Sequence, residues 1–521
     1  MRSFCSGFKL SAVSISIKNM NSSYICNACR RQLWQSITTS KRCYTRPSFA
    51  PKPTIDIKHI RNNPGLYEQN CIDRNYKQQA KYSWRILELF EQWQQYQKDG
   101  RHLREENNVI RRQLSNPTSL PSGAREPASR ESLLEQAKGL KGRIGDIEAK
   151  EKVLEEEIDE LALALPNLSS LHTPNGDVPE VIEYINEHPE PTPSDSDRVW
   201  RSHVHIGAEL DLLDFSSSAT TSGWGWYFLK NEAALLEQAL IQYSLSVARA
   251  RGWSVLTPPS IIYAHVAAAC GFQPRDQNDE QQIYRLERPA KDQDRDKPAL
   301  CLAGTAEIPF AGSKANTTLD EADLPLKVIG PSRCYRAEAG ARGVDTKGLY
   351  RVHEFTKVEM FAWTMPDHNP GEHFGEDRPS PSSTLFAEMV AIQKEILQSL
   401  GLHCRVLEMP SADLGASAVR KIDIEAFFPS RRGKDEGWGE VTSASICTDY
   451  QSRRLATRVR TERMGRRTEW PHTVNGTALA VPRVLAALLE NGWDEREMCV
   501  TIPEVLRPWM GGLEKIEKRR S

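Results

Sequence analysis

The sequence lacks any run of about 18 apolar residues, the length a helix needs to cross a bilayer. Apolar residues make up 39% of the chain and charged residues 26%, which is the balance of an ordinary globular protein. We therefore expect no membrane insertion. With 521 residues, the chain exceeds what one hydrophobic core usually supports, and two or more folded units are expected.

Acidic residues are absent from the first 55 positions, which contain nine Lys or Arg and many Ser. This composition is typical of an organellar targeting peptide. The segment SKRCYTRPS places basic residues just before Tyr44, so residues 1–44 are predicted to be a mitochondrial targeting peptide that is removed in the matrix. A basic tail that binds nucleic acid is the alternative. Without this segment the chain is net acidic, so any RNA-binding surface must be a local patch.

Closely spaced cysteines are also scarce. Of eleven Cys, only Cys26 and Cys29 form a tight pair, and neither a second pair nor a nearby His set accompanies them. A structural zinc site needs four ligands. We expect no zinc site here, and reduced thiols elsewhere.

Helical periodicity dominates residues 45–170. Residues 79–114 are rich in helix formers with apolar residues near helical spacing. After a Pro- and Ser-rich break, apolar residues recur at alternating steps of four and three from Leu133 to Leu165, with only Glu151 out of pattern. This heptad pattern predicts an antiparallel coiled-coil arm, with helices roughly 50 Å long at 1.5 Å per residue.

Basic residues gather in the outer half of this arm, where they could grip a phosphate backbone. A helical hairpin that serves only for packing or spacing is the alternative. The candidate residues for this contact are Arg101, Arg104, Arg111, Arg112, Lys138, Lys141 and Arg143.

The rest of the chain is predicted to form a linker and a second unit. Residues 171–205 are rich in Pro, Asn and acidic residues, which is typical of a linker. In 206–521, a long amphipathic helix precedes short strand-like runs. The polar stretches 287–298 and 366–383 are predicted surface insertions.

Charged residues alternate on both sides of a Gly-rich turn in CYRAEAGARGVDTKGLYRVHEFTKVEMF, which begins at Cys334. In a hairpin, Arg336 and Glu338 share one face of the first strand, while Phe355 and Glu359 share one face of the second. Such a face is poor core material because buried charges need partners, but it suits an anionic, planar ligand. A solvated hairpin with cross-strand ion pairs is the alternative.

Three further segments join this hairpin: LAGTAEIPF at 302–310, GWGEVTSASICTDYQSRR at 437–454 and NGTALAVPRVLAALLE at 475–490. Together they resemble the seryl-tRNA synthetases, which are class II aminoacyl-tRNA synthetases. The likeness includes motif 1, with the long helix and Pro258 or Pro259, motif 2 in the hairpin, motif 3 ending at Arg483, and the helical arm.

The resemblance implies an α+β fold, in which an antiparallel β-sheet catalytic domain flanked by helices follows the arm. It also implies a homodimer in which the arm of one subunit reaches tRNA bound at the other. The implied activity is ATP-dependent conversion of L-serine to seryl-adenylate and transfer to the 3′ end of tRNA(Ser), for mitochondrial translation.

The resemblance assigns the ATP site residue by residue. Arg336 would contact the α-phosphate, Glu338 the adenine side and Arg483 the γ-phosphate, while Phe355 would stack on adenine and His353 would contribute only backbone groups. The full expected ATP site is Arg336, Ala337, Glu338, Val352, His353, Glu354, Phe355, Glu440, Val441, Thr442, Ser443 and Arg483.

A serine pocket and a metal site follow from the same resemblance. Carboxylates suit the ammonium group of serine, and a site that bonds its hydroxyl should reject alanine. The expected serine site is Thr305, Ala306, Glu307, Glu359, Asn475 and Thr477. Glu440 and Ser443 match the positions for Mg²⁺, bound with ATP. This chain departs from the family at two positions: the family commonly has Ser where this chain has Thr442, and Asn where this chain has Ile446.

The sequence is also compatible with two other functions. A synthetase paralogue without activity could act as an RNA-binding or assembly factor, although such chains typically lose the phosphate-contacting Arg or the serine-pocket residues. A synthetase for threonine or proline would differ in the arm.

Overall fold

The computed structural model describes residues 50–115, 129–187, 201–272, 282–287, 297–337, 348–367, 380–461 and 467–519. The targeting peptide predicted for 1–44 and the predicted ATP residue Glu338 lie outside these ranges. Within them, no helix has the length and apolar character needed to span a membrane.

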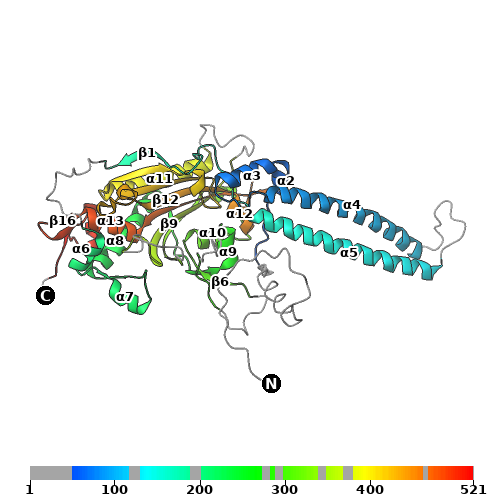
Figure 1. The fold of residues 1–521 in the computed structure, drawn as a ribbon, viewed down its shortest axis with the longest axis horizontal. Helices are drawn as coiled ribbons and strands as arrows, with labels where there is room; N and C mark the ends of the chain where they lie inside the picture. The colour runs from blue at the N-terminus through cyan, green and yellow to red at the C-terminus, as the bar shows by residue number, and fades with distance from the viewer. Residues whose placement is uncertain are drawn as a thin grey trace, which may run out of the picture.

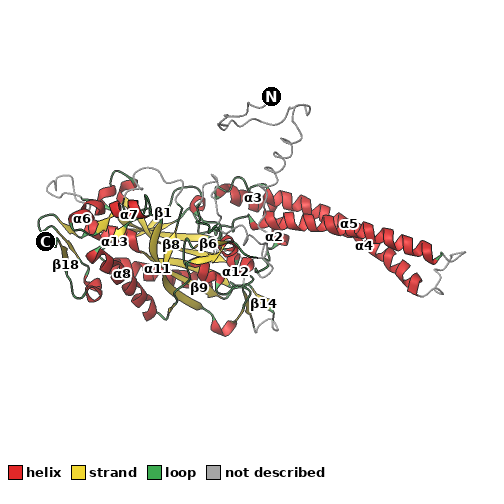
Figure 2. Cartoon of the chain, turned by 90° about the horizontal axis from the view of Figure 1, so that it is seen from below, coloured by secondary structure: helices red, strands yellow, loops and turns green. Residues whose placement is uncertain are grey.

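Two long helices form the predicted antiparallel arm. Helix α4 (Tyr82–Ser115) and helix α5 (Arg130–Leu163) lie side by side and project away from the sheet (Figures 1 and 2). The short helices α2 (Ile57–Asn62) and α3 (Pro64–Asp73) pack at the base of the arm. An apolar cluster there includes Ile86, Leu89 and Ile158, so the base is the best-packed part of the arm.

The base of the arm is fixed to the sheet domain by buried polar contacts. Arg74, which is 1% exposed, donates hydrogen bonds to the carbonyls of Asn167 and Gly415. The side-chain amide of Asn167 donates in turn to the carbonyls of Ser417 and Cys447, each at 3.0 Å. These contacts set the direction in which the arm leaves the domain.

An eight-stranded sheet forms the centre of the second unit. Every neighbouring pair is antiparallel except β4 with β8, which confirms the predicted fold class. In spatial order the strands are β1 (Glu180–Ile185), β10 (Cys404–Glu408), β11 (Arg420–Phe427), β12 (Trp438–Thr448), β15 (His472–Ala480), β9 (Glu354–Thr364), β8 (Leu326–Tyr335) and β4 (Ser254–Val255).

Three helices cover one face of this sheet: α8 (Asn231–Ala250), α11 (Pro381–Ser399) and α13 (Val481–Asn491) (Figure 1). Their apolar sides join alternate residues of the strands in the main core. A second, smaller core lies at one end of the opposite face, beneath α9 (Ala264–Ala269), α10 (Glu307–Gly312) and α12 (Tyr450–Leu455). The rest of that face is left for polar side chains.

Shorter elements surround these layers. They are α6 (His203–Glu209), β2 (Leu213–Asp214), α7 (Phe215–Thr221), β3 (Phe228–Leu229), β5 (Ile261–Tyr263), β6 (Leu300–Leu302), β7 (Thr318–Asp320), β13 (Arg458–Arg460), β14 (Thr468–Glu469), β16 (Trp493–Asp494), β17 (Cys499–Thr501), the 3₁₀ helix η7 (Glu504–Met510) and β18 (Lys515–Glu517).

The range predicted as a linker, 171–205, contains strand β1 and the start of α6. β1 pairs with β10 as the edge strand of the sheet, and most of its side chains are exposed. An edge strand exposed in this way buries little apolar surface, so its sequence carries a weak strand signal between Pro-rich flanks.

Candidate active site

Alternation along β9 separates core side chains from site side chains. Val358 and Met360 face the main core. Phe355, Lys357 and Glu359 therefore face the opposite side of the sheet. We call this side, with its polar residues on β9, β15, β12 and β11, the site face.

A β-bulge in β12 places the side chains of both Glu440 and Ser443 on the site face. Asp423 and Glu425 lie two residues apart on β11 and share one face, and they pair with Ser443 and Glu440 respectively. Because Ser443 and Glu440 are three residues apart, regular alternation would put them on opposite faces. The register shift at Val441 brings both onto the site face.

β15 contributes the next two residues. Thr477 lies directly opposite Glu359 on β9, and its Oγ1 donates to Glu359 Oε2 at 3.4 Å. Asn475, two residues earlier, points to the same side. Both Glu359 and Thr477 are nearly inaccessible, at 2% and 5% exposed.

The predicted serine residues meet at this end of the site face. Glu307, the first residue of α10, accepts hydrogen bonds from Gln451 Nε2 at 2.6 Å and from Asn475. Burial raises the pKa of Glu307 to about 7, and the negative charge of Glu359 adds to the rise against the positive charge of Lys357. Thr305 is buried just before α10 and accepts from the Glu307 backbone N–H at 3.4 Å.

Lys357 is a site residue that was not assigned a role from the sequence. Its Nζ lies 2.5 Å from Glu359 Oε2, and the residue is 8% exposed. The spacing in the sequence could have identified it, because Lys357 lies two residues from both Phe355 and Glu359, and side chains at that spacing share one face of a strand. Its ammonium group forms an ion pair with Glu359 and so compensates the charge of that buried carboxylate.

The predicted phosphate residues meet at the other end. Arg483 Nη1 donates to the carbonyl oxygen of Glu440 at 3.0 Å and to its Oε2 at 3.2 Å. Arg483 Nε donates to the carbonyl of Tyr350 at 3.0 Å, and the guanidinium lies 4.6 Å from the centre of the Tyr350 ring. The guanidinium of Arg431 lies 4.0 Å from the centre of the same ring.

Electrostatics connect the two Arg residues through Glu440. Loss of solvent works against ionisation of this carboxylate, but Arg483, Lys421 and Arg336 together lower the pKa of Glu440 to about 2. The guanidinium of Arg336 lies 5.2 Å from the centre of the Phe355 ring, and its backbone N–H donates to the carbonyl of His353 at 2.9 Å. A purine base could replace Arg336 on that ring.

Other predicted ATP residues do not offer side chains to the site face. Val441 belongs to the main core, and Thr442, opposite core residue Ile424, donates its hydroxyl to the carbonyl of Thr477. Glu354 directly precedes Phe355 on β9, so its side chain lies on the other face of the strand. There it accepts a hydrogen bond from Tyr335 Oη at 3.3 Å. Val352 is a buried apolar residue, and the backbone N–H of Ala337 donates to the carbonyl of Gln282 at 3.1 Å. Ala306, which was predicted for the serine site, is likewise a buried apolar residue.

His353 is enclosed by aromatic rings. Its Nδ1 lies 3.0 Å from both the Arg336 carbonyl and Tyr284 Oη, and its ring stacks on Trp226 with centroids 5.9 Å apart. These contacts fix the segment that leads into β9.

The donors present fit a hard divalent cation. Glu440 is held ionised and shares its face with Ser443, and Asp423, which is 4% exposed, has Oδ1 without a hydrogen-bond partner. Lys421 Nζ lies 2.6 Å from the other Asp423 oxygen. Carboxylate and hydroxyl oxygens are ligands that Mg²⁺ prefers. The described residues contain no cluster of three or more His, Cys, Asp or Glu that could hold a metal, so phosphate and water would have to complete the shell.

The arm residues differ in availability. Arg104 lies 3.2 Å from Glu148 and 3.7 Å from Glu151 across the two helices. The other six predicted tRNA-binding residues are exposed: Arg101, Arg111, Arg112, Lys138, Lys141 and Arg143.

Two family models match this chain. Residues 54–169 match the model of the seryl-tRNA synthetase N-terminal domain, and residues 284–492 match the class II tRNA synthetase core domain (G, H, P, S and T).

Similar proteins cover nearly the whole chain. The mitochondrial serine–tRNA ligase of Saccharomyces cerevisiae is 39% identical over 90% of this chain and 97% of its own length. That of Schizosaccharomyces pombe is 35% identical over 90% of each chain. The crystal structure of Pyrococcus horikoshii seryl-tRNA synthetase complexed with ATP superposes with a TM-score of 0.75 at 30% identity, covering 90% of this chain and 100% of that one.

Proposed function

Because the chain belongs to the seryl-tRNA synthetases of class II, we propose that its site face binds ATP and L-serine end to end and makes seryl-adenylate. The seryl group then passes to the 3′ end of tRNA(Ser). The observation that carries the proposal is the joint position of Glu359, Thr477 and Glu440 on one face of neighbouring strands, with Arg483, from the first turn of α13, bonded to Glu440.

In the first step, a serine carboxylate oxygen attacks the α-phosphorus of ATP. A carboxylate–phosphorus bond forms, the bond from the α-phosphorus to the bridging oxygen breaks, and pyrophosphate leaves. The protein contributes positioning and charge compensation. Arg336 would hold the α-phosphate, Arg483 the γ-phosphate, and Phe355 the adenine ring.

Glu440 and Ser443 would hold Mg²⁺. The ion would neutralise charge on the phosphates and so favour departure of pyrophosphate.

The serine end of the site would recognise two groups of the substrate, the ammonium group and the side-chain hydroxyl. Glu307 and Glu359 would receive the ammonium group, and the hydroxyls of Thr305 and Thr477 would bond the serine side chain, with Asn475 beside them. Removing the substrate hydroxyl leaves these buried groups unpaired, so discrimination against alanine should be roughly 10⁴-fold. The inactive-paralogue alternative is not favoured, because Arg336 and Arg483 and the serine pocket are all present.

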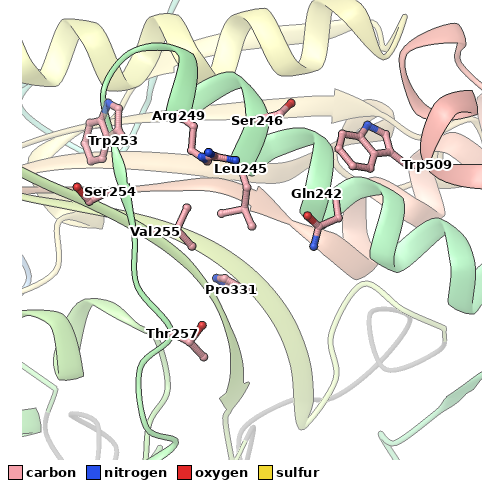
Figure 3. Close-up of a pocket in the computed structure, with 10 residues that line it drawn as sticks. All are labelled: Gln242, Leu245, Ser246, Arg249, Trp253, Ser254, Val255, Thr257, Pro331 and Trp509. Carbon is pink, nitrogen blue, oxygen red and sulfur yellow. The ribbon is translucent and has the colours of Figure 1, made fainter.

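We infer a homodimer from a groove beside β4. The groove has a volume of about 690 Å³ and runs between α8, the β4 segment and η7, with Trp253 and Trp509 among its lining residues (Figure 3). Val255 and Trp509 are 47% and 46% exposed. Exposed apolar surface of this kind marks an interface, and a second copy would extend the sheet edge at β4.

The exposed basic residues of α4 and α5 would contact the tRNA backbone, with the arm reaching tRNA bound at the other subunit. The acid-free N-terminus and the similarity to two mitochondrial ligases support a place in the mitochondrial matrix.

Serine-dependent exchange of labelled pyrophosphate into ATP tests the activity. We expect exchange with serine and at most traces with alanine or threonine at equal concentration. Absence of serine-dependent exchange in the folded protein would refute the proposed function.

A further inference from the structure

His203 bridges two buried partners at the start of α6. Its Nδ1 lies 2.8 Å from Glu490 Oε1, and its backbone N–H donates to the same oxygen at 3.0 Å. Its Nε2 accepts from the backbone N–H of Leu349 at 3.0 Å. Since Nε2 is an acceptor and Nδ1 faces a carboxylate, this network assigns a neutral ring with the proton on Nδ1.

Glu490 also binds the segment around Ser430. Near the end of α13, it accepts from the Ser430 hydroxyl at 2.8 Å and from the Ser430 backbone N–H at 3.1 Å. It is 3% exposed. Burial opposes its ionisation, but the hydrogen bonds donated by the ring and backbone of His203 and by Ser430 lower the pKa of Glu490. One carboxylate thus ties α6, α13 and the loop after β11.

The Leu349 contact leads directly to the phosphate end of the site. The next residue, Tyr350, accepts from Arg483 Nε at 3.0 Å and places its ring 4.6 Å from that guanidinium. Arg483 in turn holds Glu440 at 3.2 Å. A displacement of the Leu349 backbone would therefore move two contacts that orient Arg483.

Gly348 allows this approach. Its φ is +87°, in the region that favours glycine, and a Cβ atom there would lie 2.2 Å from His203 Nε2. The chain therefore passes His203 with no room for a side chain.

We propose that His203 is a positioning residue for ATP activation: it bridges Glu490 to Leu349 and thereby orients Arg483 towards the phosphates. The inference rests on the proposed function and extends it to a residue that touches no substrate. A purely structural role for His203 is the competing explanation.

Two amide variants separate the two hydrogen bonds of the ring. In His203→Gln, the amide oxygen can occupy the position of Nε2 and accept from Leu349. In His203→Asn, the shorter amide can occupy only the position of Nδ1 and donate to Glu490. His205→Ala is the matched control, because His205 lies on the same helix and is exposed, and its Nδ1 lies 2.9 Å from Ser202 Oγ.

Pyrophosphate exchange with the full chain provides the readout. We expect His203→Asn to raise the KM for ATP about tenfold, with the KM for serine changed less than about twofold. His203→Gln should recover most of the ATP affinity, and His205→Ala should match the unchanged protein. Thermal unfolding of each variant reports any loss of stability separately.

A lowered unfolding temperature for both amide variants, with the KM for ATP unchanged, would overturn the proposal and leave His203 a structural residue. An equal rise in both KM values would also overturn it. Failure of the unchanged protein to catalyse exchange would instead refute the proposed function, and direct titration of the variants with ATP would then still test the positioning role.

Discussion

Glu307 and Glu440 are carboxylates of the same site whose pKa values move in opposite directions. Glu307 is buried near another carboxylate, so its pKa rises to about 7. Glu440 is surrounded by Arg483, Lys421 and Arg336, so its pKa falls to about 2. Partner charges therefore keep Glu440 ionised at every physiological pH, while Glu307 changes charge near neutrality.

Serine binding should depend on the charge of Glu307. Ammonium binding needs the ionised carboxylate, so the apparent affinity for serine should increase roughly tenfold between pH 6 and pH 8. Glu307→Gln should bind serine more weakly and lose this dependence. Titration of serine at fixed ATP concentration checks both results, and an equally steep profile in the Gln variant would assign the dependence to another group.

The same pKa predicts the sign of a stability effect. Between the ordinary value of 4.5 and about 7, the folded protein binds more protons at Glu307 than the unfolded chain. The free energy of unfolding should therefore fall as pH rises through this window. In Glu307→Gln this contribution is absent, and chemical denaturation at pH 5 and pH 7.5 measures the difference.

Arg336 and Arg333 form a matched pair for the phosphate contact. Arg333 lies earlier on β8 and faces Glu237 and Glu354 at 3.5 and 3.8 Å, away from the site face. Arg336→Ala should reduce exchange by about 100-fold or more, because a preorganised positive charge is lost. Arg333→Ala should retain most activity. Equal activity of the two variants would remove Arg336 from the mechanism.

At the scale of elements, alternation predicted part of the site and could not predict the rest. The positions of Phe355, Lys357 and Glu359 follow from period-two spacing within one strand. Glu440 and Ser443 share a face only because of a bulge, and the sequence shows no local sign of it. The family resemblance indicated this pair, but alternation would have separated them.

Contacts between distant segments were also beyond sequence patterns. His203 and Glu490 are separated by 287 positions, and neither belongs to a periodic motif that pairs them. In the arm, Glu151 interrupts the heptad in sequence but is buried at 7% exposure, 3.7 Å from Arg104. Its Oε1 also lies 3.3 Å from where a Cβ of Gly100 would be. The missing side chain of Gly100 therefore makes room for this carboxylate.

Shortening the arm tests its role as an element. Replacing residues 105–147 with a short Gly-Ser turn joins the helices at the Arg104–Glu148 pair and keeps the apolar cluster at the base. We expect pyrophosphate exchange to be unchanged and tRNA charging to fall by roughly 100-fold, because phosphate contacts are lost. Unimpaired charging would show that the arm does not grip tRNA.

At the scale of the whole molecule, the exposed apolar surface beside β4 predicts association of two chains. Val255→Arg places a charge in the proposed interface, where it cannot be desolvated without cost. Sedimentation should show a dimer for the unchanged protein and a monomer for this variant. Val178→Arg is the control, since Val178 is 73% exposed and lies before β1. A monomeric unchanged protein would contradict the dimer.

The molecule joins a site on the sheet to a projecting arm, and the proposed function requires a single cavity that holds nucleotide and amino acid together. Calorimetric titration with a non-hydrolysable seryl-adenylate analogue measures this directly. We expect one molecule bound per chain, with affinity lost both in Glu359→Gln, at the serine end, and in Arg336→Ala, at the nucleotide end. Undiminished binding in either variant would show that the two ends do not form one site.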